Sequence, residues 1–206
     1  MSDTSNKKDF FEMIRLGLVL VVYAVIACTV LAIVNNLTAP QIKKNQIQKA
    51  NEAMKEVFSF ADQFVSVNDF EPSDNKNIAL SDAYLAYKDQ KIIGGVIQVE
   101  GPTYDKAKII LGIDTNGVVT GMRFLEITDS PGFGSKAKDD NYKVKSGTTF
   151  YEQFTGKNAK EGFLTNQTFD AISGATITSD GVAALLTQGS KSLLNYLEKK
   201  EVLNNE

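Results

Sequence analysis

Residues 108–128 read KIILGIDTNGVVTGMRFLEIT, and this stretch decides the kind of fold that we expect. Two runs rich in β-branched and aromatic residues, 108–114 and 118–128, flank the short segment 115–117, which reads TNG. An Asn-Gly pair between such runs is a strong signal for a β-hairpin, because both residues accept the positive backbone φ angles of a tight turn. Hairpins join antiparallel strands, so the stretch favours an antiparallel sheet over a Rossmann unit.

The neighbouring segments extend this interpretation in both directions along the chain. Upstream, the runs 83–88 and 91–100 flank Asp89-Gln90, which predicts a second hairpin. Downstream, residues 179–200 have the apolar spacing of an amphipathic helix. The apolar side of this helix consists of Val182, Leu185, Leu186, Leu193, Leu194 and Leu197. We therefore expect an α+β fold in which helices pack against a mostly antiparallel sheet.

The segment 16–34, LGLVLVVYAVIACTVLAIV, contains no charged residue. At about 1.5 Å per residue, a helix of this length is roughly 30 Å long, close to the hydrocarbon thickness of a bilayer. Extended to residue 37, the segment predicts a single transmembrane helix. Thr38 and Pro40 then carry the signals of a capped helix start, and apolar residues recur beyond them at helical spacing, which predicts a stalk helix.

These segments divide the chain into four expected parts. They are a short tail at 1–15, a transmembrane helix at 16–37, a stalk helix at 38–60 and one α+β domain at 61–206. The orientation of the span does not follow from charge. Three basic residues precede it and three lysines follow it, so the count of lysine and arginine is a tie.

Two alternatives to a permanent anchor come from the same segment. The basic residues before the apolar run also suit a cleaved signal peptide. Residues 25–28, VIAC, resemble a lipoprotein cleavage box, which would place a lipid on Cys28. Against lipidation, the apolar run continues to residue 34, where a mature lipoprotein usually becomes polar.

Composition excludes several classes of function. The chain of 206 residues carries 22 basic and 25 acidic residues, a formal net charge of −3, which argues against a sequence-blind nucleic-acid binder. It contains no histidine and one cysteine, so a Ser-His-Asp triad, an imidazole metal site and an iron–sulfur cluster are all excluded. Any redox chemistry therefore needs a bound cofactor, because the side chains of this protein are not the electron carriers.

The segment 170–179, DAISGATITS, is the candidate for such a cofactor site. Its small residues lead into the start of a helix, where unpaired backbone N–H groups and the positive end of the helix dipole attract anions. Thr178, Ser179 or Asp180 can serve as the N-cap of this helix. Capping alone explains the hydroxyl residues, but it does not explain the run of small residues, which lets a phosphate approach the backbone closely.

The pattern D-x-x-S-G-A-T at 170–176 resembles the flavinylation motif of the FMN-binding domain family, in which the final threonine is esterified to the FMN phosphate. With its N-terminal span, the whole chain resembles the G subunits of Rnf electron-transport complexes. These complexes couple ferredoxin:NAD electron transfer to Na⁺ or H⁺ translocation. Three alternatives stay open: a C subunit of a sodium-pumping NADH:quinone oxidoreductase, a stand-alone tethered extracellular flavoprotein, and an anchored module without flavin.

The resemblance implies a role for particular residues of this sequence. It assigns the covalent FMN to Thr176 and the recognition by a separate Mg²⁺-dependent flavin transferase to Asp170. The family pattern Glu-Thr-Pro-Gly-Leu-Gly, a loop beside the flavin, matches the segment 129–134, DSPGFG, and Tyr104 lies in a looser match. The expected FMN-binding residues are Ser130, Pro131, Gly132, Phe133, Gly134, Ser173, Gly174, Ala175, Thr176, Thr178 and Ser179.

The resemblance also implies how such a protein works. A tethered flavin is a fixed electron relay, so we expect no catalytic side chain and no metal ligand in this chain, and the enzyme activity belongs to the assembled complex. The expected partners are the other subunits and the flavin transferase. The domain is expected on the extracytoplasmic side of the cell membrane, with the N-terminus in the cytoplasm. The coupling ion, the electron donor and the electron acceptor stay open.

Overall fold

The first helix, α1 (Asp3–Val57), is continuous. The structure is a computed structural model that describes the backbone of residues 3–200 and the side chains of residues 11–200. The expected helix start at Thr38 is wrong, because α1 runs through Pro40 and the Thr38 hydroxyl instead donates to the Val34 carbonyl at 2.9 Å within the same helix. The residues that resemble a helix start therefore lie in the interior of one long helix.

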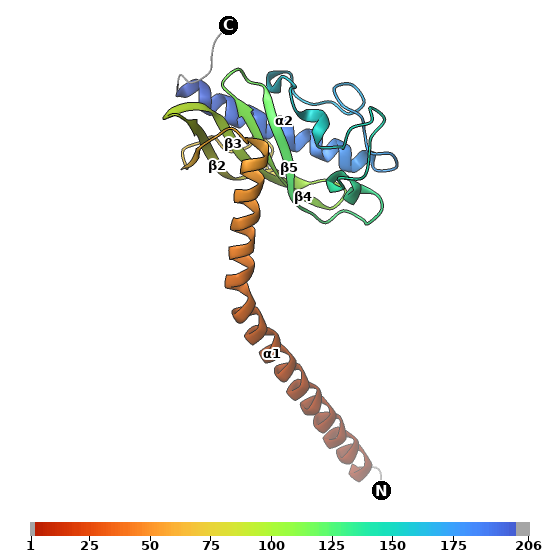
Figure 1. The fold of residues 1–206 in the computed structure, drawn as a ribbon. Coiled ribbons are helices and arrows are strands. Elements are labelled where there is room, and N and C mark those ends of the chain that lie inside the picture. Colours follow the sequence, from red (N-terminus) through yellow and green to blue (C-terminus); the bar gives the residue numbers. More distant parts are fainter. Residues whose placement is uncertain (1–2, 201–206) are drawn as a thin grey trace. The chain divides into compact units, whose positions relative to one another are not determined.

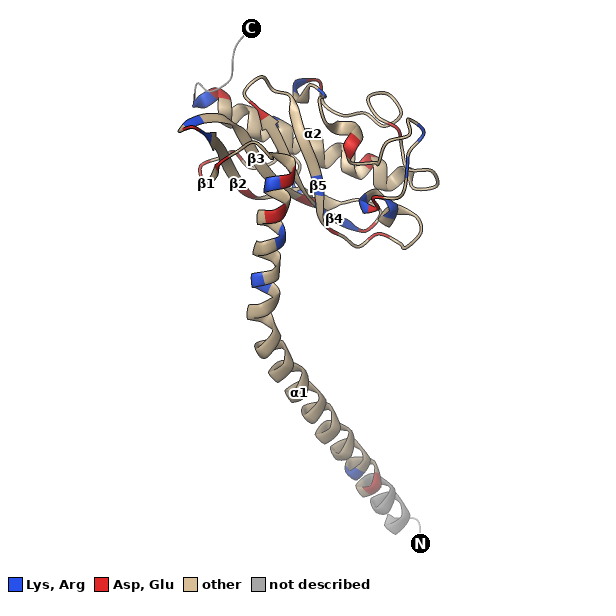
Figure 2. Ribbon diagram, viewed as in Figure 1, with Lys and Arg blue, Asp and Glu red and all other residues tan. Residues whose placement is uncertain are grey.

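In length and composition, α1 is able to cross a membrane, and among the described helices it is the one that meets this criterion. Figure 2 shows its uncharged stretch as a long tan run between charged residues at either end. The large apolar side chains of this stretch, such as Leu20 and Leu31, are exposed to their surroundings. The chain divides into two compact units, residues 1–47 and 48–206, and the second contains the end of α1 and everything after it.

A five-stranded antiparallel sheet forms the centre of the second unit (Figure 1). Its strands follow one another in sequence order and are β1 (Gln63–Val67), β2 (Ala79–Lys88), β3 (Lys91–Pro102), β4 (Lys106–Asp114) and β5 (Val119–Ile127). Both predicted hairpins are confirmed. Asp89 and Gln90 both have positive φ, as a tight two-residue hairpin turn requires. The short edge strand β1 is an element that the sequence pattern did not predict.

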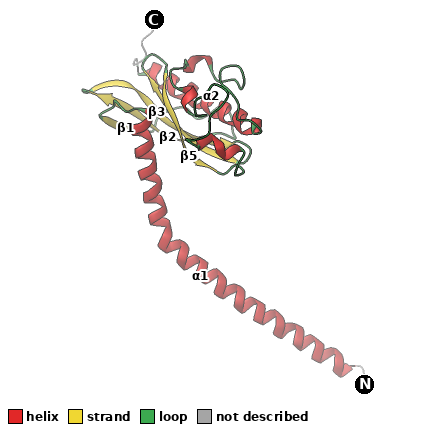
Figure 3. Ribbon diagram, turned by 45° about the vertical axis from the view of Figure 1, so that its right-hand side comes forward, coloured by secondary structure: helices red, strands yellow, loops and turns green. Residues whose placement is uncertain are grey.

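Helices cover both faces of this sheet, which gives the expected α+β class (Figure 3). On one face lies α2 (Thr176–Lys199), whose buried side includes Val182, Leu185 and Leu186. On the other face, the end of α1 places Met54 and Val57 in a second, smaller apolar cluster. Because alternate residues of a strand point to opposite faces, β3 and β4 are buried on both sides.

The segment between β1 and β2 is fastened along α2. Lys191 and Lys199 form ion pairs with Asp74 and Glu71, both at 2.5 Å, and the Ser192 hydroxyl donates to the Glu71 carbonyl at 2.7 Å. Burial and a hydrogen bond with Asp69 raise the pKa of Tyr196 to about 12. These contacts hold the C-terminal half of α2 and leave its N-terminal end beside the loops.

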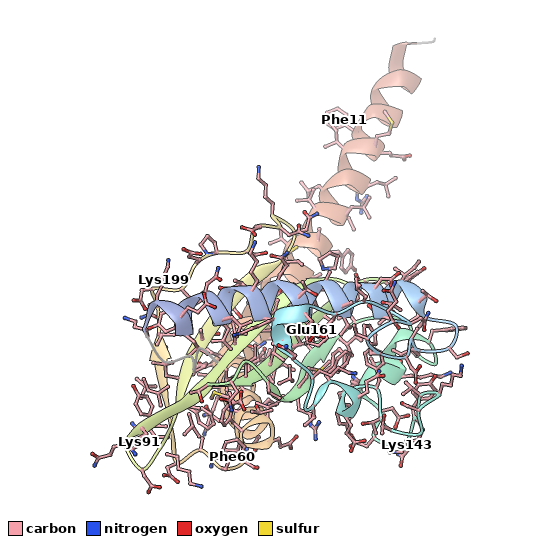
Figure 4. The ribbon with its side chains drawn as sticks, turned by 90° about the horizontal axis from the view of Figure 1, so that it is seen from above. Phe11, Phe60, Lys91, Lys143, Glu161 and Lys199 are labelled. Carbon is pink, nitrogen blue, oxygen red and sulfur yellow. The ribbon has the colours of Figure 1, made fainter. Side chains whose placement is uncertain are left out.

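A long loop-rich segment connects β5 to α2, and it contains three short 3₁₀ helices, η1 (Gly134–Lys138), η2 (Glu152–Phe154) and η3 (Ala159–Glu161). Its core is an aromatic cluster in which Phe154 packs against Phe150 and Phe169 with ring centroids 5.5 and 4.9 Å apart. Figure 4 shows α2 with Lys199 near one end and the loop of Lys143 towards the other. The loop that contains Lys143 therefore lies towards the N-terminal end of α2.

Candidate functional site

The start of α2 has three backbone N–H groups without an acceptor. The first α-helical hydrogen bond at this end runs from Ser179 N to the Ala175 carbonyl at 3.1 Å, so within the described residues the N–H groups of 176–178 have no partner. The N-cap is Ala175, which has no capping side chain. The expectation that α2 begins at 179 with a hydroxyl or aspartate cap is therefore wrong, and the helix begins at Thr176.

The two nearby hydroxyl residues fail to cap the helix because their side chains are used elsewhere. Thr178 and Ser179 are 1% and 0% exposed. The Thr178 hydroxyl donates to Asp129 at 2.5 Å, and the Ser179 hydroxyl donates to the Ala175 carbonyl and accepts from Ile172 N at 2.9 Å. The side chains of Thr178 and Ser179 support the site from the buried side of the helix, and their hydroxyls are not exposed to a ligand.

Thr176 differs from them because it is exposed, as are Ser173 and Gly174 in the loop before it. Gly174 has a φ of +76°, a conformation that suits glycine, and a Cβ atom added there would lie 3.7 Å from the ring of Phe133. Ala175 is buried, and its N–H donates to the Ile172 carbonyl at 3.0 Å, which tightens the turn into the helix. The loop thus presents one threonine hydroxyl next to the free N–H groups of α2.

Asp129 joins three segments of this site. The residue is 3% exposed, and its carboxylate accepts hydrogen bonds from the Thr103 hydroxyl at 2.6 Å, the Thr178 hydroxyl at 2.5 Å, Asp105 N at 2.9 Å and Tyr104 N at 3.3 Å. Burial raises the pKa of Asp129, but these hydrogen bonds lower it by more, so that the pKa lies below its ordinary value of 3.8. An ionised carboxylate therefore connects the β3–β4 turn, the loop after β5 and the first turn of α2.

The loop 130–134 lies directly against this first turn. Gly134 is buried, and a Cβ atom there would overlap both Thr178 Oγ1 and the Asp129 carboxylate, so only glycine fits. Ser130, Pro131 and Gly132 are exposed. In the same turn, the Ser130 carbonyl accepts from Phe133 N at 3.2 Å, and Gly132 N donates to Ser135 Oγ at 3.2 Å. The structure therefore brings the predicted segments 130–134 and 173–179 together.

Two aromatic side chains at the site are exposed. Phe133 is 58% exposed and its ring lies near Gly174, and Tyr104 is 64% exposed on the β3–β4 turn that Asp129 holds. Ile177, in the first turn of α2, is 62% exposed. Large apolar groups that the fold leaves uncovered beside an anion-binding helix start suit a flat, partly apolar ligand that carries a phosphate.

Asp170 has a structural role in the same loop. Its side chain accepts from Ser146 N at 2.8 Å, and its backbone exchanges two hydrogen bonds with the Gln153 amide, at 2.8 and 3.0 Å. A hollow of about 370 Å³ lies beside it. The hollow is lined by Ser146, Thr148, Gln153, Lys157, Asn166, Gln167, Thr168, Phe169 and Asp170. Asp170 therefore holds the approach to 173–176 in place and stays half-buried.

The sequence pattern located this site but did not assign Asp129 a role. Asp129 stood only as the first residue of the family-like segment 129–134, and its partners Thr103 and Thr178 lie far from it in sequence. A buried acid between a turn and a helix start is visible only once the sheet has folded. Among the described residues, no group of three or more acidic or cysteine side chains is arranged to hold a metal ion.

The fold and the candidate site are those of an α+β domain with an anion-binding helix start, carried on a helix able to span a membrane. A family profile described as the FMN-binding domain matches residues 104–191, and one described as the RnfG N-terminal region matches residues 1–57. The first profile spans Tyr104, the loop 129–134 and the loop 170–179. The residues present also fit FMN, since they offer free N–H groups for a phosphate and exposed rings for a flavin.

Curated relatives identify the particular family, and each of them is the G subunit of a complex. For the Na⁺-translocating ferredoxin:NAD⁺ oxidoreductase complex of Acetobacterium woodii, the identity is 30% over 85% of this chain and 89% of the relative. For the proton-translocating ferredoxin:NAD⁺ oxidoreductase complex of Clostridium ljungdahlii, it is 26% over 94% of this chain and 96% of the relative. For an ion-translocating oxidoreductase complex of Vibrio cholerae, it is 28% over 92% and 93%. The chain belongs to the family of G subunits of these ion-translocating oxidoreductase complexes.

Proposed function

We propose that this chain is an electron-transfer subunit of an ion-translocating oxidoreductase complex and that it carries FMN as a phosphoester of Thr176. The observation that carries the proposal is an exposed threonine hydroxyl at the uncapped start of α2, inside a matched FMN-binding domain. The other hydroxyls of the first turn, those of Thr178 and Ser179, are buried and hydrogen-bonded. Their engagement leaves Thr176 as the accessible acceptor in this turn.

The residues around Thr176 supply binding and orientation. The N–H groups of 176–178 are donors for a bound phosphate, and a phosphate there also benefits from the positive end of the helix dipole. Gly174 gives room at the backbone, and the exposed rings of Phe133 and Tyr104 would be available to a flavin. FMN, when bound, supplies the capacity to accept and release electrons. No side chain of this chain is assigned a catalytic role, and no metal ligand is assigned.

The transmembrane helix would hold the FMN-binding domain at the membrane surface. We assign the transmembrane helix to 16–37, the stalk to 38–60 and the FMN-binding domain to 61–206, with the tail 1–15 in the cytoplasm and the domain outside. A relay of this kind needs neighbouring redox groups, which the other subunits of the complex supply. The relatives include a Na⁺-translocating and a proton-translocating complex, and no described residue of the site selects between the two ions.

Maturation requires a second protein, a flavin transferase, for which we assign Asp170 and its loop as the recognition element. The half-buried Asp170 presents the loop in one conformation through Ser146 and Gln153. In the proposed step the Thr176 hydroxyl oxygen forms a bond to the flavin-nucleotide phosphorus, the P–O bond to the leaving group of the nucleotide donor breaks, and the hydroxyl proton is released. The product therefore gains the mass of one FMN less one water.

The proposal is tested by in-gel flavin fluorescence of the chain produced together with its flavin transferase. We expect fluorescence to survive denaturation in the wild-type chain and to vanish in Thr176→Val, which keeps the size and branching of the side chain but has no hydroxyl. Ser173→Ala is the matched control, because it removes an exposed hydroxyl three residues away, and it should stay fluorescent. A fluorescent Thr176→Val band would contradict the assignment.

A further inference from the structure

Tyr142 reaches the loop before Thr176 from the long segment after β5. Its hydroxyl accepts a hydrogen bond from Ser173 N at 3.2 Å, and the ring is half-buried. Within the described residues, the hydroxyl proton of Tyr142 has no acceptor. The side chain therefore places a free O–H donor at the edge of the loop that carries the proposed attachment site.

Lys136 is held over the ring of this tyrosine. Its Nζ lies 5.3 Å from the ring centroid of Tyr142, in the range of a cation–π contact, and the residue is half-buried in η1. No carboxylate of the described residues pairs with it. The acids that follow it are used elsewhere, because Asp139 accepts from Asn141 N and Asp140 accepts from the Tyr151 hydroxyl.

Two negative charges near the first turn of α2 would be stabilised by a cation close to that turn. Asp129 is buried and ionised next to the first turn of α2, and a phosphodiester on Thr176 adds a second negative charge nearby. The free N–H groups of α2 provide only partial positive charge. Lys136 lies two residues beyond Gly134, which packs directly against that first turn. Hydrogen bonds between an ammonium and a phosphate are among the stronger ones.

We propose that Lys136 and Tyr142 bind the phosphate that joins FMN to Thr176, with the Lys136 ammonium as its counter-charge and the Tyr142 hydroxyl as a hydrogen-bond donor. The inference rests on the proposed function, since it requires the phosphoester. Both residues are positioning residues for the cofactor. They lie outside every segment that the sequence pattern assigned to flavin binding, because the contact with Ser173 depends on the folding of the loop 139–145.

The first test measures how Lys136 reacts with an amine-acylating reagent, by quantitative peptide mass spectrometry. Two preparations of the full chain are compared, one produced with the flavin transferase and one without it. We expect flavin attachment to reduce labelling of Lys136 several-fold and to leave labelling of Lys138 unchanged. Lys138 is the matched control, because it is exposed in the same short helix. Equal labelling of Lys136 in the two preparations would overturn the inference.

The second test separates phosphate binding from simple shielding by the flavin ring. The ³¹P resonance of the flavin-loaded chain reports the phosphodiester directly. We expect Lys136→Gln and Tyr142→Phe to shift this resonance, and Lys136→Arg, which keeps the charge, to leave it close to wild type. Lys138→Gln should leave it unchanged, whereas an unshifted resonance in both Lys136→Gln and Tyr142→Phe would contradict the inference.

The two proposals fail in different ways. If the chain produced with the transferase has the mass of the unmodified polypeptide, the attachment to Thr176 is wrong. If its mass includes FMN but Lys136 is labelled equally with and without the cofactor, the attachment stands and the phosphate contact is wrong. The labelling test uses only the wild-type chain, so it decides the matter even if a variant folds poorly.

Discussion

The carboxylate of Asp129 accepts hydrogen bonds from two side-chain hydroxyls and two backbone amides, and these donors come from the β3–β4 turn and from α2. One side chain therefore links the β3–β4 turn, the loop after β5 and the first turn of α2, which carries Thr176. A buried carboxylate with this many donors is stable as an anion, which explains why its pKa is lowered in spite of burial. Removing the charge while keeping the shape tests this directly.

We predict that Asp129→Asn lowers the free energy of unfolding by about 1–3 kcal/mol at about pH 7. The asparagine amide cannot accept all four hydrogen bonds, so buried donors lose their partners. Thermal or urea unfolding of the full chain in detergent measures the change. Asp105→Asn, at an exposed neighbouring position whose side chain interacts with Lys106 through its charge, should change stability by less than about 0.5 kcal/mol.

The same variant has a pH signature whose sign follows from the lowered pKa. A carboxyl with a folded pKa below 3.8 contributes stability above that value and loses the contribution as the pH falls through the folded pKa. The wild-type chain should therefore lose more stability than Asp129→Asn on acidification below about pH 4. Parallel loss in both proteins would mean that Asp129 is not the group responsible.

Residue types in order along the chain predicted a candidate cofactor site, but not how the parts of this site are held together. The segments 129–134 and 170–179 are recognisable because their small residues are contiguous in the sequence. The roles of Asp129 and Tyr142 depend on partners brought together by the fold, such as Thr178 and Ser173. The spacing of residues along the sequence does not predict contacts between residues that are far apart in the chain.

Among the secondary-structure elements, α2 approaches the sheet very closely near its N-terminal end. A Cβ atom on Gly181 would lie 2.6 Å from Thr103 Cα and 2.8 Å from the Pro102 carbonyl, and backbone atoms cannot move aside as a side chain can. The small residue at this position lets the helix start lie against the β3–β4 turn. This contact and the hydrogen bond from Thr178 to Asp129 position the same end of α2.

We predict that Gly181→Ala destabilises the domain by about 1–3 kcal/mol, although alanine is the better helix former by about 1 kcal/mol. The clash pushes α2 away from the turn, so flavin attachment should fall as well. Urea unfolding and in-gel fluorescence measure the two effects. Asp180→Ala, at the exposed neighbouring position, should change stability by no more than about 0.5 kcal/mol, and a neutral Gly181→Ala would show that the close packing is wrong.

Strong local signals predicted the elements better than weak ones did. Both hairpins and the amphipathic α2 follow from periodicity and turn residues, and the structure confirms them. The predicted helix caps were wrong at two places. Thr38-Pro40 lies inside α1, and the hydroxyls at the start of α2 bond to partners other than the helix end. The short strand β1, which is mostly exposed at the edge of the sheet, has too little alternation of apolar and polar residues to be recognised from the sequence.

The chain combines an FMN-binding domain with a helix that is long and apolar enough to cross a membrane. Its orientation is a prediction, because the basic residues on either side of the span do not differ in number. The chain has one cysteine, Cys28, which lies in the apolar stretch. This composition makes cysteine labelling a simple way to determine the side on which the domain lies.

We predict that the domain is extracytoplasmic. In a Cys28→Ala background, Asn141→Cys places one thiol on an exposed loop of the domain. A membrane-impermeant maleimide should label it in intact cells as fully as after lysis, provided that the outer layers of the cell are permeable to the reagent. Labelling that requires lysis would place the domain in the cytoplasm. The Cys28→Ala chain itself is the unlabelled control.

The central claim is a phosphoester between FMN and Thr176, and fragmentation mass spectrometry of the tryptic peptide 161–191 tests it most directly. This peptide contains the hydroxyls of Ser173, Thr176, Thr178 and Ser179, so fragment masses assign the site among them. For the chain produced with its flavin transferase, we predict a mass increase of one FMN less one water, located at Thr176. An unmodified peptide, or the same increase located at another residue, would contradict the claim.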